Sequence, residues 1–123
     1  MEAYALKYML LIYIDENALS TAEREHCYDE SAQYAQELSN SGKYLDAAPL
    51  HPTSTATSVR VRDGKQLITD GPFAETREQL GGYFLIEVKN LDEAISVAKK
   101  IPGGRWGTVE IRPVMEIQGS PTE

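Results

Sequence analysis

The sequence is poor in cysteine and in positive charge. Cys27 is the single cysteine, so no disulfide can form within the chain and nothing points to an oxidising compartment. Lys and Arg total 12 against 19 Asp and Glu, which gives a formal net charge of −7. Duplex nucleic acids and anionic membrane surfaces both require a local excess of Lys and Arg. We therefore expect neither a nucleic-acid partner nor a membrane partner.

Long apolar runs and known catalytic motifs are also missing. The longest apolar run, residues 6–14, is too short to span a bilayer, and it lacks the basic leader and cleavage site of a signal peptide. We accordingly expect a cytoplasmic protein. No CxxC, HExxH, GxSxG or phosphate-binding glycine loop is present in the sequence. These observations predict no cofactor and no metal site.

The chain that remains is of ordinary composition. It has 123 residues, of which 41% are apolar and 25% charged, as is usual for one globular domain. We predict a single domain over residues 1–118 and a polar tail over 119–123.

Hydrophobic periodicity predicts an α+β fold. Strands are expected at 6–14, 44–50, 83–88 and 108–117, and a hairpin at 58–69 turns at Asp63-Gly64. The first helix is expected to begin at a capping box of Ser20 and Glu23, and the second helix spans 91–101 after an Asn90 cap. The order is that of a ferredoxin-like split β-α-β fold with an inserted β-hairpin.

The apolar character of two strands predicts that the protein forms a dimer. Residues 6–14 and 83–88 are apolar on both alternating faces, whereas two helices can cover only one face of a sheet. A second subunit can cover the other face, so we expect a homodimer with the two sheets face to face, an assembly like a dimeric α/β-barrel.

The stretch TDGPFAETREQLGGY, residues 69–83, is the candidate functional segment. Asp70, Gly71 and Pro72 are typical of a turn, and Gly81 and Gly82 would let the chain reverse into the next strand. Phe73 is the only large apolar residue between Thr69 and Leu80 and is expected to anchor the loop in the core. The thirteen residues from Asp70 to Gly82 exceed the roughly 2–5 residues of a usual hairpin loop. A binding loop and a purely structural connection both fit this length.

The candidate site residues surround this loop. Asp70 and His51 are candidates for general acid-base catalysis, His51 because imidazole titrates near neutral pH. The predicted binding residues are Asp15, Glu75, Arg77, Glu78 and Tyr83. Arg77 is the cation of this set, and one of the carboxylates could pair with it. Asp15 ends the first strand, where the edge of a sheet often meets a cleft.

Two longer stretches resemble a known family. DGPFAETREQLGGYFLIEVKNLDEA, residues 70–94, and RWGTVEIRPV, residues 105–114, resemble the DGPF proteins of the YCII-related family. The resemblance implies a small protein with a dimeric ferredoxin-like α+β fold, encoded near extracytoplasmic-function sigma factors. It implies no established reaction, although a His-Asp pair in a cleft has led some YCII members to be proposed as enzymes.

Three functions remain open from the sequence. The first is binding of a small molecule in a polar cleft beside the loop, with or without acid-base chemistry. The second is a non-catalytic, protein-binding role in a sigma-factor-linked signalling system, which only the resemblance suggests. The third is a loop that is purely structural and completes the dimer. Whether the protein is an enzyme is left open.

Overall fold

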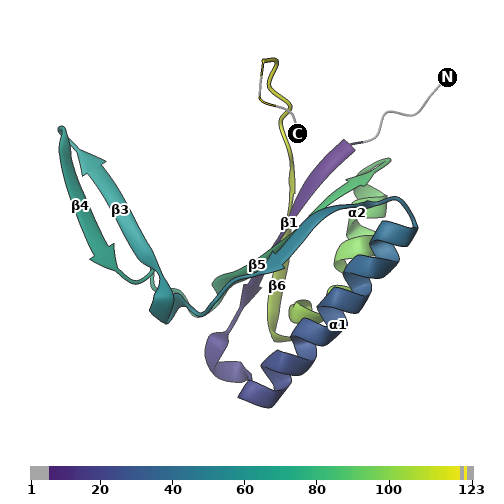
Figure 1. Cartoon of the computed structure of the whole chain (residues 1–123), viewed down its shortest axis with the longest axis horizontal. Helices are drawn as coiled ribbons and strands as arrows, with labels where there is room; N and C mark the ends of the chain where they lie inside the picture. The colour runs from purple at the N-terminus through teal and green to yellow at the C-terminus, as the bar shows by residue number, and fades with distance from the viewer. Residues whose placement is uncertain (1–5, 120, 122–123) are drawn as a thin grey trace.

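The computed structural model describes residues 6–119 and 121 and consists of a four-stranded sheet, two helices and a projecting hairpin (Figure 1). Three residues of the predicted polar tail, 120, 122 and 123, lie outside the described part. The strands are β1 (Leu6–Ile14), β2 (Tyr44–Pro49), β3 (Thr57–Arg62), β4 (Lys65–Asp70), β5 (Gln79–Val88) and β6 (Gly107–Pro113). The helices are α1 (Thr21–Asn40) and α2 (Leu91–Ala98), and the short 3₁₀ turns are η1 (Glu16–Ala18), η2 (Thr53–Thr55) and η3 (Pro102–Trp106).

The order of the strands in the main sheet is β2-β5-β1-β6, and β1 pairs antiparallel with both of its neighbours. This order, with one helix after β1 and one after β5, is compatible with the predicted ferredoxin-like fold. Strands β3 and β4 pair only with each other and form a separate arm. The predicted α+β class is therefore confirmed.

The core lies between the sheet and the two helices, which Figure 1 shows on one side of the sheet. Alternate residues of β1 and β5 point into it, and the Tyr34 ring of α1 packs on Phe84 with ring centroids 6.0 Å apart. The Tyr34 hydroxyl donates to the Val97 carbonyl at 2.8 Å and so ties α1 to α2. The buried apolar residues are Tyr8, Leu10, Ile12, Tyr34, Leu38, Phe84, Ile86, Val88, Ala94, Val97 and Ile101.

Local signals in the sequence placed the ends of several elements correctly. Both hydrogen bonds of the Ser20–Glu23 capping box are present, and Asn90 caps α2 by accepting from the Glu93 amide. The arm turns through Asp63 and Gly64, which have φ of 53° and 74°, as a tight hairpin turn requires.

Other boundaries differ from the prediction. The second helix ends at Ala98 rather than at residue 101, and the last strand ends at Pro113 rather than at residue 117. Strand β5 begins at Gln79 rather than at residue 83, so the connection from the arm is residues 71–78 and not the predicted thirteen-residue loop. Gly81 and Gly82 consequently lie inside a strand and do not reverse the chain.

Gly81 and Gly82 form an irregular point in β5. The register between β1 and β5 shifts here, because Ile12 faces Gly82 and Tyr13 faces Leu80, which leaves Gly81 as the extra residue of a bulge. A Cβ on Gly82 would lie 3.0 Å from the Ala48 carbonyl oxygen and 3.2 Å from the Pro49 Cα. A side chain here would therefore push the β2 backbone away by a few tenths of an ångström.

Neither helix in the described part of the chain combines the length and apolar character needed to cross a membrane.

We predict that Gly82→Val will destabilise the fold much more than Arg77→Ala. The valine side chain would meet the β2 backbone, and overpacking of this kind costs about 1–3 kcal/mol. The Arg77 side chain is 89% exposed, so its loss should change the free energy of unfolding by no more than about 0.5 kcal/mol. Urea unfolding of both variants measures the difference; equal stabilities would contradict this account of Gly82.

Candidate functional site

A polar cleft of about 460 Å³ lies at the end of the sheet where β1 stops and β5 starts. Three segments that are distant in the sequence form it: the turn after β1, the turn after β2, and the 71–78 connection together with the first residue of β5. The lining residues are Glu16, Asn17, Thr53, Ser54, Gly71, Pro72, Glu75, Thr76, Arg77 and Gln79. The cleft therefore adjoins the DGPF segment, residues 70–73, of which Gly71 and Pro72 line it.

Glu16 and Thr53 join two walls of this cleft. The Thr53 amide donates to one carboxylate oxygen of Glu16 at 2.9 Å, and the Thr53 hydroxyl donates to the other at 2.6 Å. Both bonds are partly buried and have a charged acceptor, which makes them stronger than bonds between neutral groups. They fix the turn after β2 against the end of β1.

Asp15 forms hydrogen bonds with two residues that line the cleft, Asn17 and Arg77. One of its carboxylate oxygens accepts from the Asn17 amide at 3.0 Å and so caps η1, and the other accepts from Arg77 Nε at 3.3 Å. Arg77 is thus bonded to a carboxylate as expected, but the partner is Asp15 rather than Asp70, Glu75 or Glu78. Because the Arg77 side chain is exposed, this ion pair positions the connection more than it stabilises the fold.

Polar contacts, rather than Phe73, hold the connection in place. Gly71, at φ +100°, donates its amide to the Ala56 carbonyl at 2.7 Å and accepts the Ser58 hydroxyl at 2.7 Å. Gln79 donates to the carbonyls of Ala74 and Thr76 at 3.2 and 3.1 Å. Phe73 is 84% exposed, so the predicted apolar anchor is wrong for the single chain. It follows Pro72 in a segment whose start is held by the Gly71 amide and whose end is held by the Gln79 side chain.

The predicted site residues do not all gather in the cleft. Glu75 and Arg77 line it, and Asp15 contacts it through Arg77. Asp70 ends β4 and His51 follows β2; both are exposed, and neither is among the lining residues. The two candidate catalytic residues are therefore outside the lining of the cleft.

Glu78 and Tyr83 have partners elsewhere. Glu78 accepts from the Thr108 hydroxyl of β6 at 2.9 Å. Tyr83 lies on the face of the sheet opposite the helices, where its hydroxyl donates to Asp46 at 2.7 Å. That hydrogen bond is lost when the phenol ionises, so it raises the pKa of Tyr83 above the ordinary value.

Thr53 and Ser54, which complete the cleft, were not among the predicted site residues, and neither were Asn17, Thr76 and Gln79. The one signal for Thr53 and Ser54 was the turn-forming run after Pro52, which does not show which strand end the turn will meet. Within residues 6–119 and 121, no group of three or more His, Cys, Asp or Glu side chains is arranged to hold a metal ion.

Comparison with known proteins identifies the family. Residues 6–118 match the YCII-related domain. An uncharacterised protein of Rhizobium meliloti (strain 1021) is 36% identical over 112 residues, which cover 87% of this chain and 90% of that protein. The chain therefore belongs to the YCII-related family, in agreement with the resemblance seen in the sequence.

We predict that Glu16 and Thr53 are energetically coupled. In a double-mutant cycle of Glu16→Ala and Thr53→Ala, the coupling free energy of unfolding should be about 1–2 kcal/mol, because the hydroxyl bond ends on a partly buried carboxylate. Thr55 serves as the control, since its hydroxyl donates to Pro52 within the same turn. Coupling of Glu16 to Thr53 no larger than its coupling to Thr55 would contradict the assignment.

Proposed function

We propose that the protein binds a small polar molecule in the cleft beside the 71–78 connection. The observation that carries this proposal is the composition of the lining, which brings a carboxylate, a guanidinium, hydroxyls and amides together from three segments. A few convergent polar groups in a concave site are typical of small-molecule binding. Both carboxylate oxygens of Glu16 accept hydrogen bonds from Thr53, whereas Arg77 bonds to Asp15 through Nε alone. Glu75 and the terminal nitrogens of Arg77 are therefore the charged groups that we propose contact a ligand.

Acid-base chemistry is a narrower form of this proposal. Glu75 is the lining carboxylate that could exchange a proton with a ligand, whereas Asp70 and His51 would require movement of the surrounding loops to reach it. Binding alone accounts for the geometry of the cleft, so we propose a binding site. Turnover of a bound ligand would show that the site is also catalytic.

We predict that a panel of small polar molecules, made up of amino acids, hydroxy acids, amines and sugars, contains compounds that bind here. In ¹H–¹⁵N NMR titrations, a binder should shift the amides of Asn17, Thr53 and Thr76 in a saturable way. Arg77→Ala or Glu75→Gln should weaken an anionic or a cationic binder, respectively, by roughly tenfold, since each variant removes one charged contact. Gln33→Glu on the exposed surface of α1 is the control for altered charge. A panel that shifts none of these amides would overturn the proposal.

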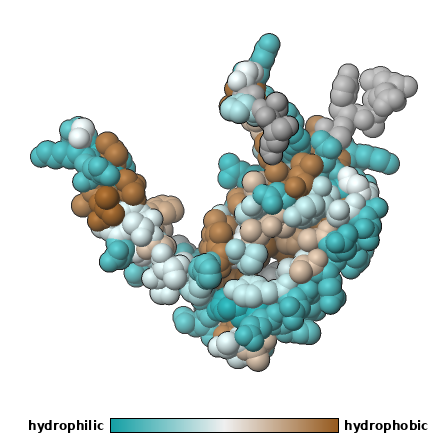
Figure 2. Space-filling view, viewed as in Figure 1, coloured by the Kyte–Doolittle hydropathy of each residue, from teal (hydrophilic) through white to brown (hydrophobic). Residues whose placement is uncertain are grey.

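We also propose that the protein is a homodimer in which a second copy covers the open face of the sheet and the arm. Met9, Leu11 and Leu85 point to the face opposite the helices and are only half-buried. On the arm, Val59, Val61 and Ile68 share one face, and all three are exposed. Figure 2 shows apolar residues along the arm and on the body across the hollow from it.

The arm gives a physical reason for such a partner. A two-stranded hairpin without other packing is marginally stable at best in water, and every residue of β4 is exposed. The open face of the sheet carries basic as well as acidic side chains, Lys7 and Arg112 beside Glu87 and Glu110, so charge alone selects no partner. The exposed apolar face of the arm and the apolar residues of the open face belong to one sequence, so a second copy can cover both.

We predict that sedimentation equilibrium at micromolar concentration will give twice the 13.7 kDa mass of the chain. Val59→Glu combined with Val61→Glu should shift the protein toward monomer, because both changes place charge on the apolar face of the arm. Gln33→Glu adds the same kind of charge on the exposed surface of α1 and should leave the mass unchanged. A wild-type monomer under these conditions would refute the dimer.

A further inference from the structure

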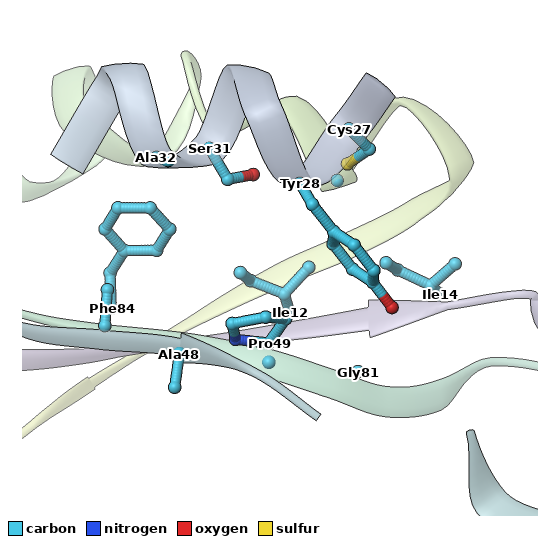
Figure 3. A pocket seen from close by; sticks show the side chains of 13 residues that line it. Ile12, Ile14, Cys27, Tyr28, Ser31, Ala32, Ala48, Pro49, Gly81 and Phe84 are labelled. Atoms are coloured by element: carbon cyan, nitrogen blue, oxygen red, sulfur yellow. The ribbon is translucent and has the colours of Figure 1, made fainter. Parts of the chain in front are cut away.

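The structure contains a second cavity, which is apolar and lies between α1 and the sheet (Figure 3). Its volume is about 250 Å³. Figure 3 shows Ser31 and Tyr28 descending from α1 into the gap, with Ile12, Ile14 and Phe84 rising from the strands below. None of the residues that line this cavity also lines the polar cleft.

The cavity exists because the facing residues are small. Farther along α1, Tyr34 and Leu38 fill the space between helix and sheet. At this end the helix presents Ser31, and the strands below present Ala47, Gly81 and Gly82. The space is not sealed from solvent, because Tyr28, Ala32 and Pro49 at its rim are exposed, so a ligand can enter it from one side.

The chemistry of the lining is neutral. No charged side chain lines the cavity, and its side-chain polar atoms are the Cys27 thiol and the hydroxyls of Tyr28 and Ser31. Burial raises the pKa of the Cys27 thiol, which keeps it protonated near neutral pH. An ionic ligand would lose its hydration here without gaining a partner of opposite charge, whereas an apolar ligand would gain from leaving water.

The size of the cavity limits the ligand further. A cavity of about 150 Å³ lined by aliphatic and aromatic side chains is large enough to bind benzene. The present cavity is larger but falls below the roughly 300–1,000 Å³ of pockets for drug-sized ligands. It therefore suits a molecule of one or two rings, or a branched aliphatic chain of similar bulk.

From these observations we propose that the cavity under α1 is a binding site for a neutral, apolar molecule of one or two rings, with the hydroxyls of Ser31 and Tyr28 available to a single polar substituent. Tyr28 is 37% exposed and stands at the edge of the cavity, with its ring directed toward Ile14 (Figure 3). The site is separate from the polar cleft, so the two proposals can fail independently.

Indole, a neutral two-ring molecule, is the probe for this site. In ¹H–¹⁵N NMR titrations of the full chain, indole should shift the amides of Cys27, Ser31, Gly81 and Gly103 with a common saturation curve. Naphthalene-2-sulfonate, which has two rings and a negative charge, should bind roughly tenfold more weakly or worse. Indole shifts confined to the cleft amides, or equal affinity for both probes, would overturn the proposal.

Two variants that fill the cavity test its position. Ser31→Leu fills the cavity from α1. Ala47→Leu fills it from β2, where Ala47 lies opposite Phe84. Each variant should weaken indole binding by roughly tenfold or more. Gln33→Leu adds the same side chain on the exposed surface of α1, away from the cavity, and should retain binding within about threefold. Urea unfolding shows whether each variant folds. If one filling variant does not fold, indole binding to the other one tests the site. Arg77→Ala, in the cleft, should leave indole binding unchanged. Unaltered affinity in a folded filling variant would refute the site.

Discussion

The close approach of β2 to Gly82 is the constraint on which this end of the molecule depends. A side chain at position 82 would press on the Ala48 carbonyl oxygen and the Pro49 Cα, so β2 would have to move back by a few tenths of an ångström. The Leu50 amide then donates to the Gly81 carbonyl at 2.8 Å, which holds the end of β2 against the bulge in β5. From that point the chain turns into η2, so the position of Thr53 opposite Glu16 follows from the contact at Gly82.

The start of β5, which contains Gly81 and Gly82, has a different environment on each of its two sides. Toward the helices the two glycines leave space that no neighbouring side chain fills, and the result is an apolar cavity. Toward the DGPF segment the chain leaves the sheet, its amides and carbonyls need partners outside the ladder, and side-chain hydrogen bonds supply them. Packing therefore shapes the apolar cavity on the helix side, and polar contacts shape the cleft beside the 71–78 connection. This difference explains why the two sites have unlike chemistry.

The sequence predicted those features that depend on neighbouring residues. Helix caps at Ser20 and Asn90 and the Asp63-Gly64 turn act within a few residues, so their chemistry can be read directly. The role of Gly81 and Gly82 was misjudged, because glycine in an extended strand and glycine in a loop look alike without the partner strand. Thr53 was missed because its partner, Glu16, is 37 positions away in the sequence. Phe73 was misplaced for a related reason: an isolated apolar residue shows that something should cover it, but not whether the cover belongs to the same chain.

The exposure of Phe73 links the polar cleft to assembly. Phe73 follows Pro72, which lines the cleft, and burying a side chain of this size stabilises a fold by about 1.5–3 kcal/mol. In the single chain that stabilisation is not realised, and the connection is held by a small set of hydrogen bonds and an exposed ion pair. If a second copy covers Phe73, dimer formation orders the wall that carries Glu75 and Arg77. By linkage, a ligand that needs this wall ordered would then bind the dimer more tightly than the monomer, and would in turn strengthen the dimer by the same factor. The apolar cavity lies between α1 and the sheet and shares no lining residue with the cleft, so its affinity should not depend on protein concentration in this way.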